Sequence, residues 1–416
     1  MNILFIHEVD WLKKVVFDIH NLAEILSARG HNVYAIDYED TWKKSGFWDF
    51  GSLKTKELAG KERAVPGSNV MLRRPGFIKI PVLSRLSAGC THYFEIKRTI
   101  REKKIDVILL YSVPTNGLQT INIARKLGVP VVFRSIDMLH GLVRNPVLRP
   151  ITKYLESKVY SRADAILAIT PNHSRYVTDM SADKARVKIL PLPIDTSLFH
   201  PGVDYAEIQQ KWGFTEKDKV VVFIGTLFEF SGMDVFIREF PYVTRRIPEA
   251  RLLIVGDGPQ RKKLERIISE LKLEKQVTIT GFQPYNTMPQ YINMAALCIN
   301  PFLNTDETRD IFPGKIIQYI ACGKAAVVTP LLGITSLIPD ESKGVVYTNT
   351  AADMANKVAD LLASSEHRKA LEQAGIEYIN EVHDQRKIGE KLETELQQII
   401  SKYGKIKGQA NKEGKS

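Results

Sequence analysis

The chain has 416 residues, of which 44% are hydrophobic, and a formal net charge of +11. This length predicts two or three domains, and the hydrophobic fraction is ordinary for globular domains with full-sized cores. No run approaches the roughly 18 apolar residues of a membrane-spanning helix, and the acids in the first ten residues argue against a secretory signal. Three widely spaced cysteines, Cys90, Cys298 and Cys322, argue against a disulfide framework or a Cys-x-x-Cys zinc site and favour a reducing cytoplasm.

Short apolar runs alternate with amphipathic stretches along the first half of the chain, and we expect each run to form a β-strand. The runs are 2–7, 32–37, 106–111, 129–134, 165–169 and 187–190. The amphipathic stretches at 15–29 and 117–127 are each followed by glycine, the residue that most often terminates a helix. Apolar strands separated by helices predict a parallel sheet that is covered on both faces.

The proline-rich segment 191–202 has no helical period and is expected to be a linker. After it the alternation of strands and helices restarts. The expected strands are 219–225, 251–256, 276–280, 296–300, 325–329 and 344–347. We therefore predict the α/β class, with two doubly wound sheets in tandem. The polar and basic residues 404–416 are expected to be disordered.

Glycine and proline gather where strands of the second sheet are expected to end, which is where such sheets bind ligands. The four segments are 225–232 (GTLFEFSG), 256–259 (GDGP), 281–284 (GFQP) and 312–315 (FPGK). A helix starting at Gly314 presents unpaired amides that suit a phosphate, although Pro313 and Gly314 could merely start a buried helix. With two sheets, the expected site is the cleft between the domains. No dinucleotide fingerprint follows the first strand, which disfavours an NAD enzyme.

Five blocks of the second half, in their order and spacing, resemble the family 4 (group 1) glycosyltransferases of the GT-B fold. The blocks are FIGTLFEFSGMD, PEARLLIVGDGP, VTITGFQP, LCINPF and FPGKIIQYIACGKAAVV. The resemblance implies two Rossmann-like domains that face each other across a cleft. Residues 1–198 would bind the acceptor, 199–383 would bind a nucleotide-sugar, and a helix at 384–403 would pack back on the first domain. It also implies transfer of a sugar with retention at the anomeric carbon, without a metal or another cofactor.

The resemblance assigns a set of donor-binding residues. They are Gly225, Thr226, Ser231, Gly256, Asp257, Gly258, Gly281, Phe282, Asp310, Phe312, Pro313, Gly314 and Gln318. Phe282 is expected either to stack on the base or to be simple packing. The chain departs from the family where an Arg and a Lys are usual, at Thr226 and Ser231, and where a second acid is usual, at Gln318. We expect Lys315 to bind the donor pyrophosphate in place of the missing cations; alternatively, its amine points into solvent.

In the first domain the family often places a His directly before an acid, but here Ile136 precedes Asp137 and His140 follows three residues later. Asp137 and His140 join Lys315 as candidate catalytic residues, although a lone His is as often structural. On the acceptor side we also place His7, Trp11 and Arg134.

The expected function is transfer of a sugar to a cell-envelope glycan or a lipid-linked acceptor. The alternatives are a non-catalytic GT-B-like nucleotide-sugar-binding or scaffold subunit and, less favoured, a phosphorylase or epimerase. Residues 71–104 carry nine Lys or Arg and two Glu among apolar residues, and residues 402–416 carry five Lys and one Glu. The remainder is balanced, which argues against a nucleic-acid partner. We expect 71–104 to attach the protein peripherally to the inner face of an anionic cell membrane or to a lipid-phosphate acceptor; alternatively, it is an ordinary solvated face.

Overall fold

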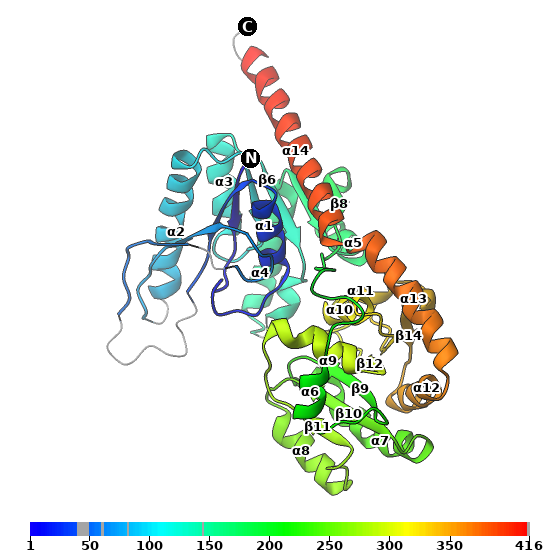
Figure 1. Cartoon of the computed structure of the whole chain (residues 1–416). Coiled ribbons are helices and arrows are strands. Elements are labelled where there is room, and N and C mark those ends of the chain that lie inside the picture. The colour runs from blue at the N-terminus through cyan, green and yellow to red at the C-terminus, as the bar shows by residue number, and fades with distance from the viewer. Residues whose placement is uncertain (40–49, 60–61, 81–82, 144, 414–416) are drawn as a thin grey trace. The chain divides into compact units, whose positions relative to one another are not determined.

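The computed structural model describes residues 1–39, 50–59, 62–80, 83–143 and 145–413 (Figure 1). The chain divides into two compact units. The first consists of Met1–Pro193 and Arg386–Ser416, and the second of Ile194–Gln385. Each unit is built around one sheet with helices packed against it.

The sheet of the first unit has eight strands in the order β3-β4-β2-β1-β5-β6-β7-β8. The strands are β1 (Asn2–Ile6), β2 (Asn32–Ile36), β3 (Lys56–Ala59), β4 (Val70–Arg74), β5 (Val107–Leu110), β6 (Val131–Ser135), β7 (Ala165–Ala168) and β8 (Val187–Ile189). All neighbours pair in parallel except β3 and β4. The helices are α1 (Asp18–Ala28), α2 (Leu83–Glu102), α3 (Gly117–Leu127), η1 (Leu139–Leu142), α4 (Leu148–Arg162), α5 (Pro171–Asp179) and η2 (Lys184–Arg186).

Alternate residues of β1 point to opposite faces of this sheet and belong to two separate cores. Ile3 and Phe5 pack with α1 and with the long helix α14 (Gln385–Glu413). Leu4 and Ile6 pack with α2, α3, α4 and α5 on the other face. The prediction of disorder from residue 404 is wrong for 404–413, which continue α14; residues 414–416 lie outside the described part of the chain.

The sheet of the second unit has six parallel strands in the order β11-β10-β9-β12-β13-β14. The strands are β9 (Lys219–Ile224), β10 (Ala250–Val255), β11 (Val277–Ile279), β12 (Leu297–Asn300), β13 (Ala326–Val328) and β14 (Val345–Tyr347). The helices are α6 (Ala206–Lys211), η3 (Glu229–Ser231), α7 (Met233–Arg246), α8 (Arg261–Glu270), η4 (Tyr285–Thr287), α9 (Met288–Met294), α10 (Lys315–Ala321), α11 (Leu332–Thr335), η5 (Glu341–Lys343), α12 (Ala351–Ala363) and α13 (Ser365–Val382). The strand order reverses between β9 and β12, which makes this the switch point of the sheet.

The strands expected from the sequence are all present, but β3 and β4 were missed. β4 ends in Arg73 and Arg74, and both side chains are buried in ion pairs rather than exposed. Arg73 pairs with Glu95 at 3.0 Å, and Arg74 pairs with Asp37 and Asp10. This corrects the expectation that the arginines of 71–104 face an anionic surface: these two are already neutralised within the protein.

Candidate functional site

The first candidate site lies at the switch point between β9 and β12, where doubly wound sheets form a crevice for ligands. Lys315, the first residue of α10, extends its side chain to this point. Its Nζ lies 4.2 Å from the ring centroid of Phe223 on β9 and 4.5 Å from that of Phe302, which follows β12. The sequence pointed to the lysine but to neither ring, although the position of each ring near the end of a strand was an available signal.

The Lys315 ammonium has no hydrogen-bond or ion-pair partner among the described residues, only the two ring faces. Burial lowers the pKa of Lys315 to about 7. Cation–π contacts offset only part of the cost of desolvating a charge. The amine therefore lies against two ring faces, on a side chain that is half-buried.

Three glycines close the loops around this lysine. A Cβ on Gly225 would lie 2.5 Å from Nζ of Lys315, and a Cβ on Gly256 would lie 1.9 Å from the carbonyl oxygen of Gly225. A Cβ on Gly258 would lie 2.7 Å from the backbone of Leu227. The loops after β9 and β10 therefore pack backbone against backbone, and at each of the three positions a residue larger than glycine would clash.

The third strand-end loop follows β11 and holds Gly281 and Phe282. Gly281 has a φ of +72° and forms a bridge with the loop after β10. Phe282 is 72% exposed, and it makes no ring contact with another described residue. In the loop after β10, the pKa of Asp257 is lowered mainly by the hydrogen bond that its carboxylate accepts from the backbone amide of Gly258. The guanidinium of Arg261, which lies 3.0 Å from the same carboxylate, lowers this pKa further. Phe282 therefore presents an open aromatic face beside this loop.

Other predicted donor residues serve the protein itself. Thr226 is exposed, but the Ser231 hydroxyl is buried and donates to the carbonyl of Phe228 at 2.7 Å. Phe312 is buried and stacks on His383, with 6.2 Å between ring centroids. Ser231 and Phe312 stay predicted donor residues, and their side chains already have partners within the protein.

Asp310 and Gln318, which occupy the positions of the paired acids, also have partners within the second unit. The Asp310 carboxylate accepts a hydrogen bond from Nε of Arg309 at 3.4 Å. The Tyr285 hydroxyl is hydrogen-bonded to Gln318, and burial raises the pKa of Tyr285 to about 12.

The helix start that follows them is short. Gly314 is the N-cap of α10 and has no side chain that could cap the helix. Pro313, the residue before it, is buried. α10 has only seven residues. The Lys315 side chain therefore contributes more positive charge at the switch point than the N-terminus of this short helix does.

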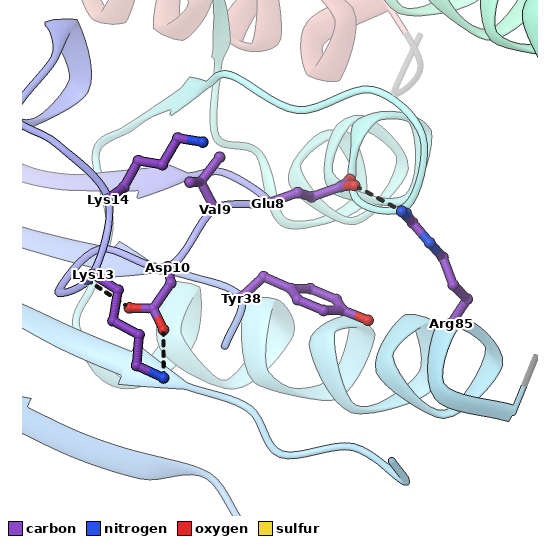
Figure 2. A pocket seen from close by; sticks show the side chains of 7 residues that line it. All are labelled: Glu8, Val9, Asp10, Lys13, Lys14, Tyr38 and Arg85. Atoms are coloured by element: carbon purple, nitrogen blue, oxygen red, sulfur yellow. Dashed lines mark hydrogen bonds and ion pairs between the residues drawn. The ribbon is translucent and has the colours of Figure 1, made fainter. Parts of the chain in front are cut away.

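A second candidate site is a cavity of about 310 Å³ in the first unit (Figure 2). It lies at the carboxyl ends of β1 and β2, beside the start of α2. It is lined by Glu8, Val9, Asp10, Lys13, Lys14, Tyr38 and Arg85. Of these residues, only Arg85 belongs to a segment that the sequence marked, the basic residues 71–104; no motif marks the other six.

Both carboxylates of this cavity are already satisfied by the protein. Glu8 accepts hydrogen bonds of 2.8 Å from two backbone amides at the start of α3 and lies 3.6 Å from Arg85. Asp10 lies 2.9 Å from Arg74. Two groups remain available, because neither the Tyr38 hydroxyl nor the Lys14 ammonium has a hydrogen-bond or ion-pair partner among the described residues. The cavity therefore suits a ligand with hydroxyl groups and some negative charge.

The residues placed on the acceptor side from the sequence do not line this cavity. Burial lowers the pKa of His7 to about 3, and the ring of Trp11 is fully buried. Arg134 is also fully buried and lies 2.9 Å from Asp18. This corrects the prediction for all three side chains: they hold the loop after β1 and the core in place.

Asp137 and His140 both follow β6. Burial, followed by the charge of Asp18, raises the pKa of Asp137. His140 places Nδ1 2.7 Å from the fully buried carboxylate of Glu156 on α4. Because a carboxylate only accepts, Nδ1 carries the proton and Nε2 is left as an acceptor.

Glu156 is a residue that sequence reasoning missed. Its carboxylate also accepts from the backbone amides of Leu139 and His140 and from the hydroxyls of Tyr160 and Tyr176. One buried group thus fixes both the backbone of η1 and the imidazole. Nothing in the local sequence distinguishes it from an ordinary surface Glu on a helix.

Comparison with known proteins gives a consistent family. The family model for glycosyl transferases group 1 matches residues 204–378, and that for the glycosyl transferase 4-like domain matches residues 16–193. The chain is 27% identical over 326 residues to a GDP-mannose-dependent phosphatidylinositol monomannoside mannosyltransferase of Mycolicibacterium smegmatis, covering 76% of this chain and 80% of that protein. It is also 27% identical over 266 residues to the alpha-D-kanosaminyltransferase of Streptomyces kanamyceticus, covering 60% of this chain and 65% of that protein.

Two solved structures share the fold. A sucrose-phosphate synthase from Thermosynechococcus elongatus has a TM-score of 0.72 at 16% identity and covers 96% of this chain and 99% of its own. The Anabaena protein HepE, in complex with UDP-glucose, has a TM-score of 0.71 at 16% identity and covers 96% of this chain and all of its own. The two family matches together extend over most of both units, and the chain belongs to the group 1 (family 4) glycosyltransferases of the GT-B fold.

Proposed function

We propose that this glycosyltransferase moves a sugar from a nucleotide-sugar bound by the second unit to a cell-envelope glycan or lipid-linked acceptor bound by the first. The observation that carries the donor assignment is the Lys315 ammonium, held against two ring faces at the switch point and without a counter-ion among the described residues. The donor's pyrophosphate supplies that counter-ion. The exposed ring of Phe282 then offers a stacking surface for the base.

In the transfer step the bond from the anomeric carbon to the donor phosphate breaks, and its electron pair leaves with the nucleoside diphosphate. The Lys315 ammonium stabilises the charge that develops on the leaving phosphate. The acceptor hydroxyl forms the new bond to the anomeric carbon on the same face, and its proton passes to the departing phosphate oxygen. The protein thus contributes mainly positioning and electrostatics.

The acceptor is assigned to the cavity of Figure 2 and to His140. Lys14 and the Tyr38 hydroxyl provide a cation and a hydrogen-bonding group for a hydroxyl-rich ligand. His140, fixed through Glu156, offers Nε2 as an acceptor for a sugar hydroxyl. The mycobacterial relative, named for a phosphatidylinositol mannoside acceptor, supports the lipid-linked class.

A non-catalytic nucleotide-sugar-binding subunit is the second candidate. One observation favours it: the usual pair of cations is replaced by Thr226 and by Ser231, whose hydroxyl is engaged with Phe228. Lys315 is then the positive group that the described residues place beside the ends of β9 and β12.

The two candidates are separated by incubating the purified protein with UDP-, GDP- and ADP-sugars, measuring both binding and release of nucleoside diphosphate. Release that exceeds the background rate excludes the scaffold, and tight binding without release supports it. No binding of any donor would overturn both. We also propose that release needs no metal, as the family resemblance implies, so that a chelator should leave the rate unchanged.

A further inference from the structure

The outward face of α2 is apolar along much of its length. Leu83, Leu86 and Phe94 follow helical spacing and are exposed, Leu86 by 65% and Phe94 by 68%. The opposite face of the same helix is buried against the sheet through Ile96 and Ile100. An exposed apolar stripe on a helix that already has a buried apolar face needs an explanation beyond folding.

α4 carries a second stripe of the same kind at its start. Val147 is 71% exposed and Tyr154 is 60% exposed, and Leu148 and Ile151 between them are exposed as well. Later in the helix, Val159 and Tyr160 are buried in the core beneath. α3 contacts both α2 and α4, so the two stripes belong to one layer of helices on one face of the first sheet (Figure 1).

The charge of this layer is strongly positive. α2, α3 and α4 together contain ten Lys or Arg and three Glu. Two of the three acids are buried and engaged: Glu95 with Arg73 and Arg98, and Glu156 with η1 and two tyrosines. The outward face therefore combines apolar stripes with cations and almost no exposed negative charge.

We infer that the outer face of α2, α3 and α4 is a docking surface for an anionic lipid bilayer. The cations, among them Arg149 and Lys153 on α4, attract the negatively charged headgroups, and the two apolar stripes enter the interface. None of the described helices is long and apolar enough to cross a membrane, so the contact is a surface contact. This surface differs from the one expected from residues 71–104: it does not include the ion-paired arginines of β4, and it does include α4. Pro81 and Val82 of the expected segment lie outside the described residues.

The test is cosedimentation of the full chain with vesicles of phosphatidylcholine and phosphatidylglycerol in equal amounts. Replacing Arg149 and Lys153 by Gln should weaken partitioning about five-fold per charge at low salt. Replacing Leu86 and Phe94 by Ser, or separately Leu148 and Ile151 by Ser, should weaken it at least about ten-fold. High salt should weaken binding of the parent protein, because exposed charges are then screened.

Matched controls lie on the second unit. The double variant Lys262→Gln and Arg266→Gln makes the same change in net charge. The double variant Val235→Ser and Leu332→Ser removes two exposed apolar side chains. Each of these control variants should bind the vesicles like the parent protein. The inference is overturned if the parent fails to bind at low salt, or binds pure phosphatidylcholine equally well. It is also overturned if the control variants lose as much binding as the others. Normal binding by the Leu148 and Ile151 variant would remove α4 from the surface.

Discussion

Lys315 is the residue on which the account of the donor site depends, and its burial makes a prediction about stability. Burial lowers its pKa from the ordinary value of 10.5 to about 7. Between these values the unfolded chain holds a proton that the folded chain has released, so folding stability rises with pH in this window. Lys315→Met removes that group while filling the space between the rings.

The melting temperature of the parent protein, relative to that of Lys315→Met, should therefore rise between about pH 7 and about pH 9. Differential scanning calorimetry at matched ionic strength measures this difference. A difference that stays constant over the window would show that the ammonium is not desolvated in the folded protein.

Glu156 is predicted to act through His140. Glu156→Gln keeps the shape but weakens the hydrogen bond to Nδ1, a charge-assisted contact worth about 1.5–3 kcal/mol. We expect turnover to fall about ten- to hundred-fold, with a changed pH profile and an unchanged Kd for the donor, because both residues belong to the first unit. An equal loss of donor affinity, or a pH profile like that of the parent protein, would contradict this positioning role.

At the scale of single residues, the sequence predicted the lysine but not its surroundings. Phe223 lies on β9 and Phe302 follows β12; the two are far apart in the chain, and no local pattern brings them together. For Arg134 the sequence was misleading in the opposite way. An arginine is expected at the surface unless its partner is known, and the partner of Arg134, Asp18, lies more than a hundred residues away in the chain.

At the scale of elements, the glycine loops around the donor site make the clearest prediction. Gly256→Ala forces a Cβ to within 1.9 Å of the Gly225 carbonyl oxygen, so the loops after β9 and β10 must separate. We expect a loss of about 1–3 kcal/mol in stability together with weaker donor binding. Gly404→Ala, a helical position with open space around its Cβ, should instead gain about 0.5–1 kcal/mol. Chemical denaturation compares the two; similar effects of both would contradict the steric argument.

The strands were predictable where they are buried on both faces, because such strands read as short apolar runs. β3 and β4 were missed for opposite reasons. β3 is a largely exposed edge strand of sequence KELA. β4 is buried but ends in two arginines whose partners, such as Glu95 and Asp37, come from other parts of the fold. Alternation and composition carry no information about such distant pairs.

At the scale of the whole molecule, α14 links the end of the chain to the core of the first unit. Ile388, Leu392 and Leu396 are buried in that core beside Leu22. Leu392→Ala should cost about 2–5 kcal/mol and lower the unfolding transition of the first unit alone. Fluorescence and calorimetric unfolding, with and without a donor bound to the second unit, identify the two transitions. An equal shift in both would contradict the division into two units.

The central claim is that Lys315 binds the phosphates of a nucleotide-sugar at the switch point of the second sheet. Calorimetric titration with the donor found in the screen tests it most directly, below about pH 7, where the ammonium keeps its proton. Lys315→Met should weaken binding about 10- to 150-fold, the loss of one hydrogen bond to a charged group. Lys357→Met, an exposed lysine on α12, should bind like the parent protein. Equal affinity of Lys315→Met and the parent protein would contradict the account.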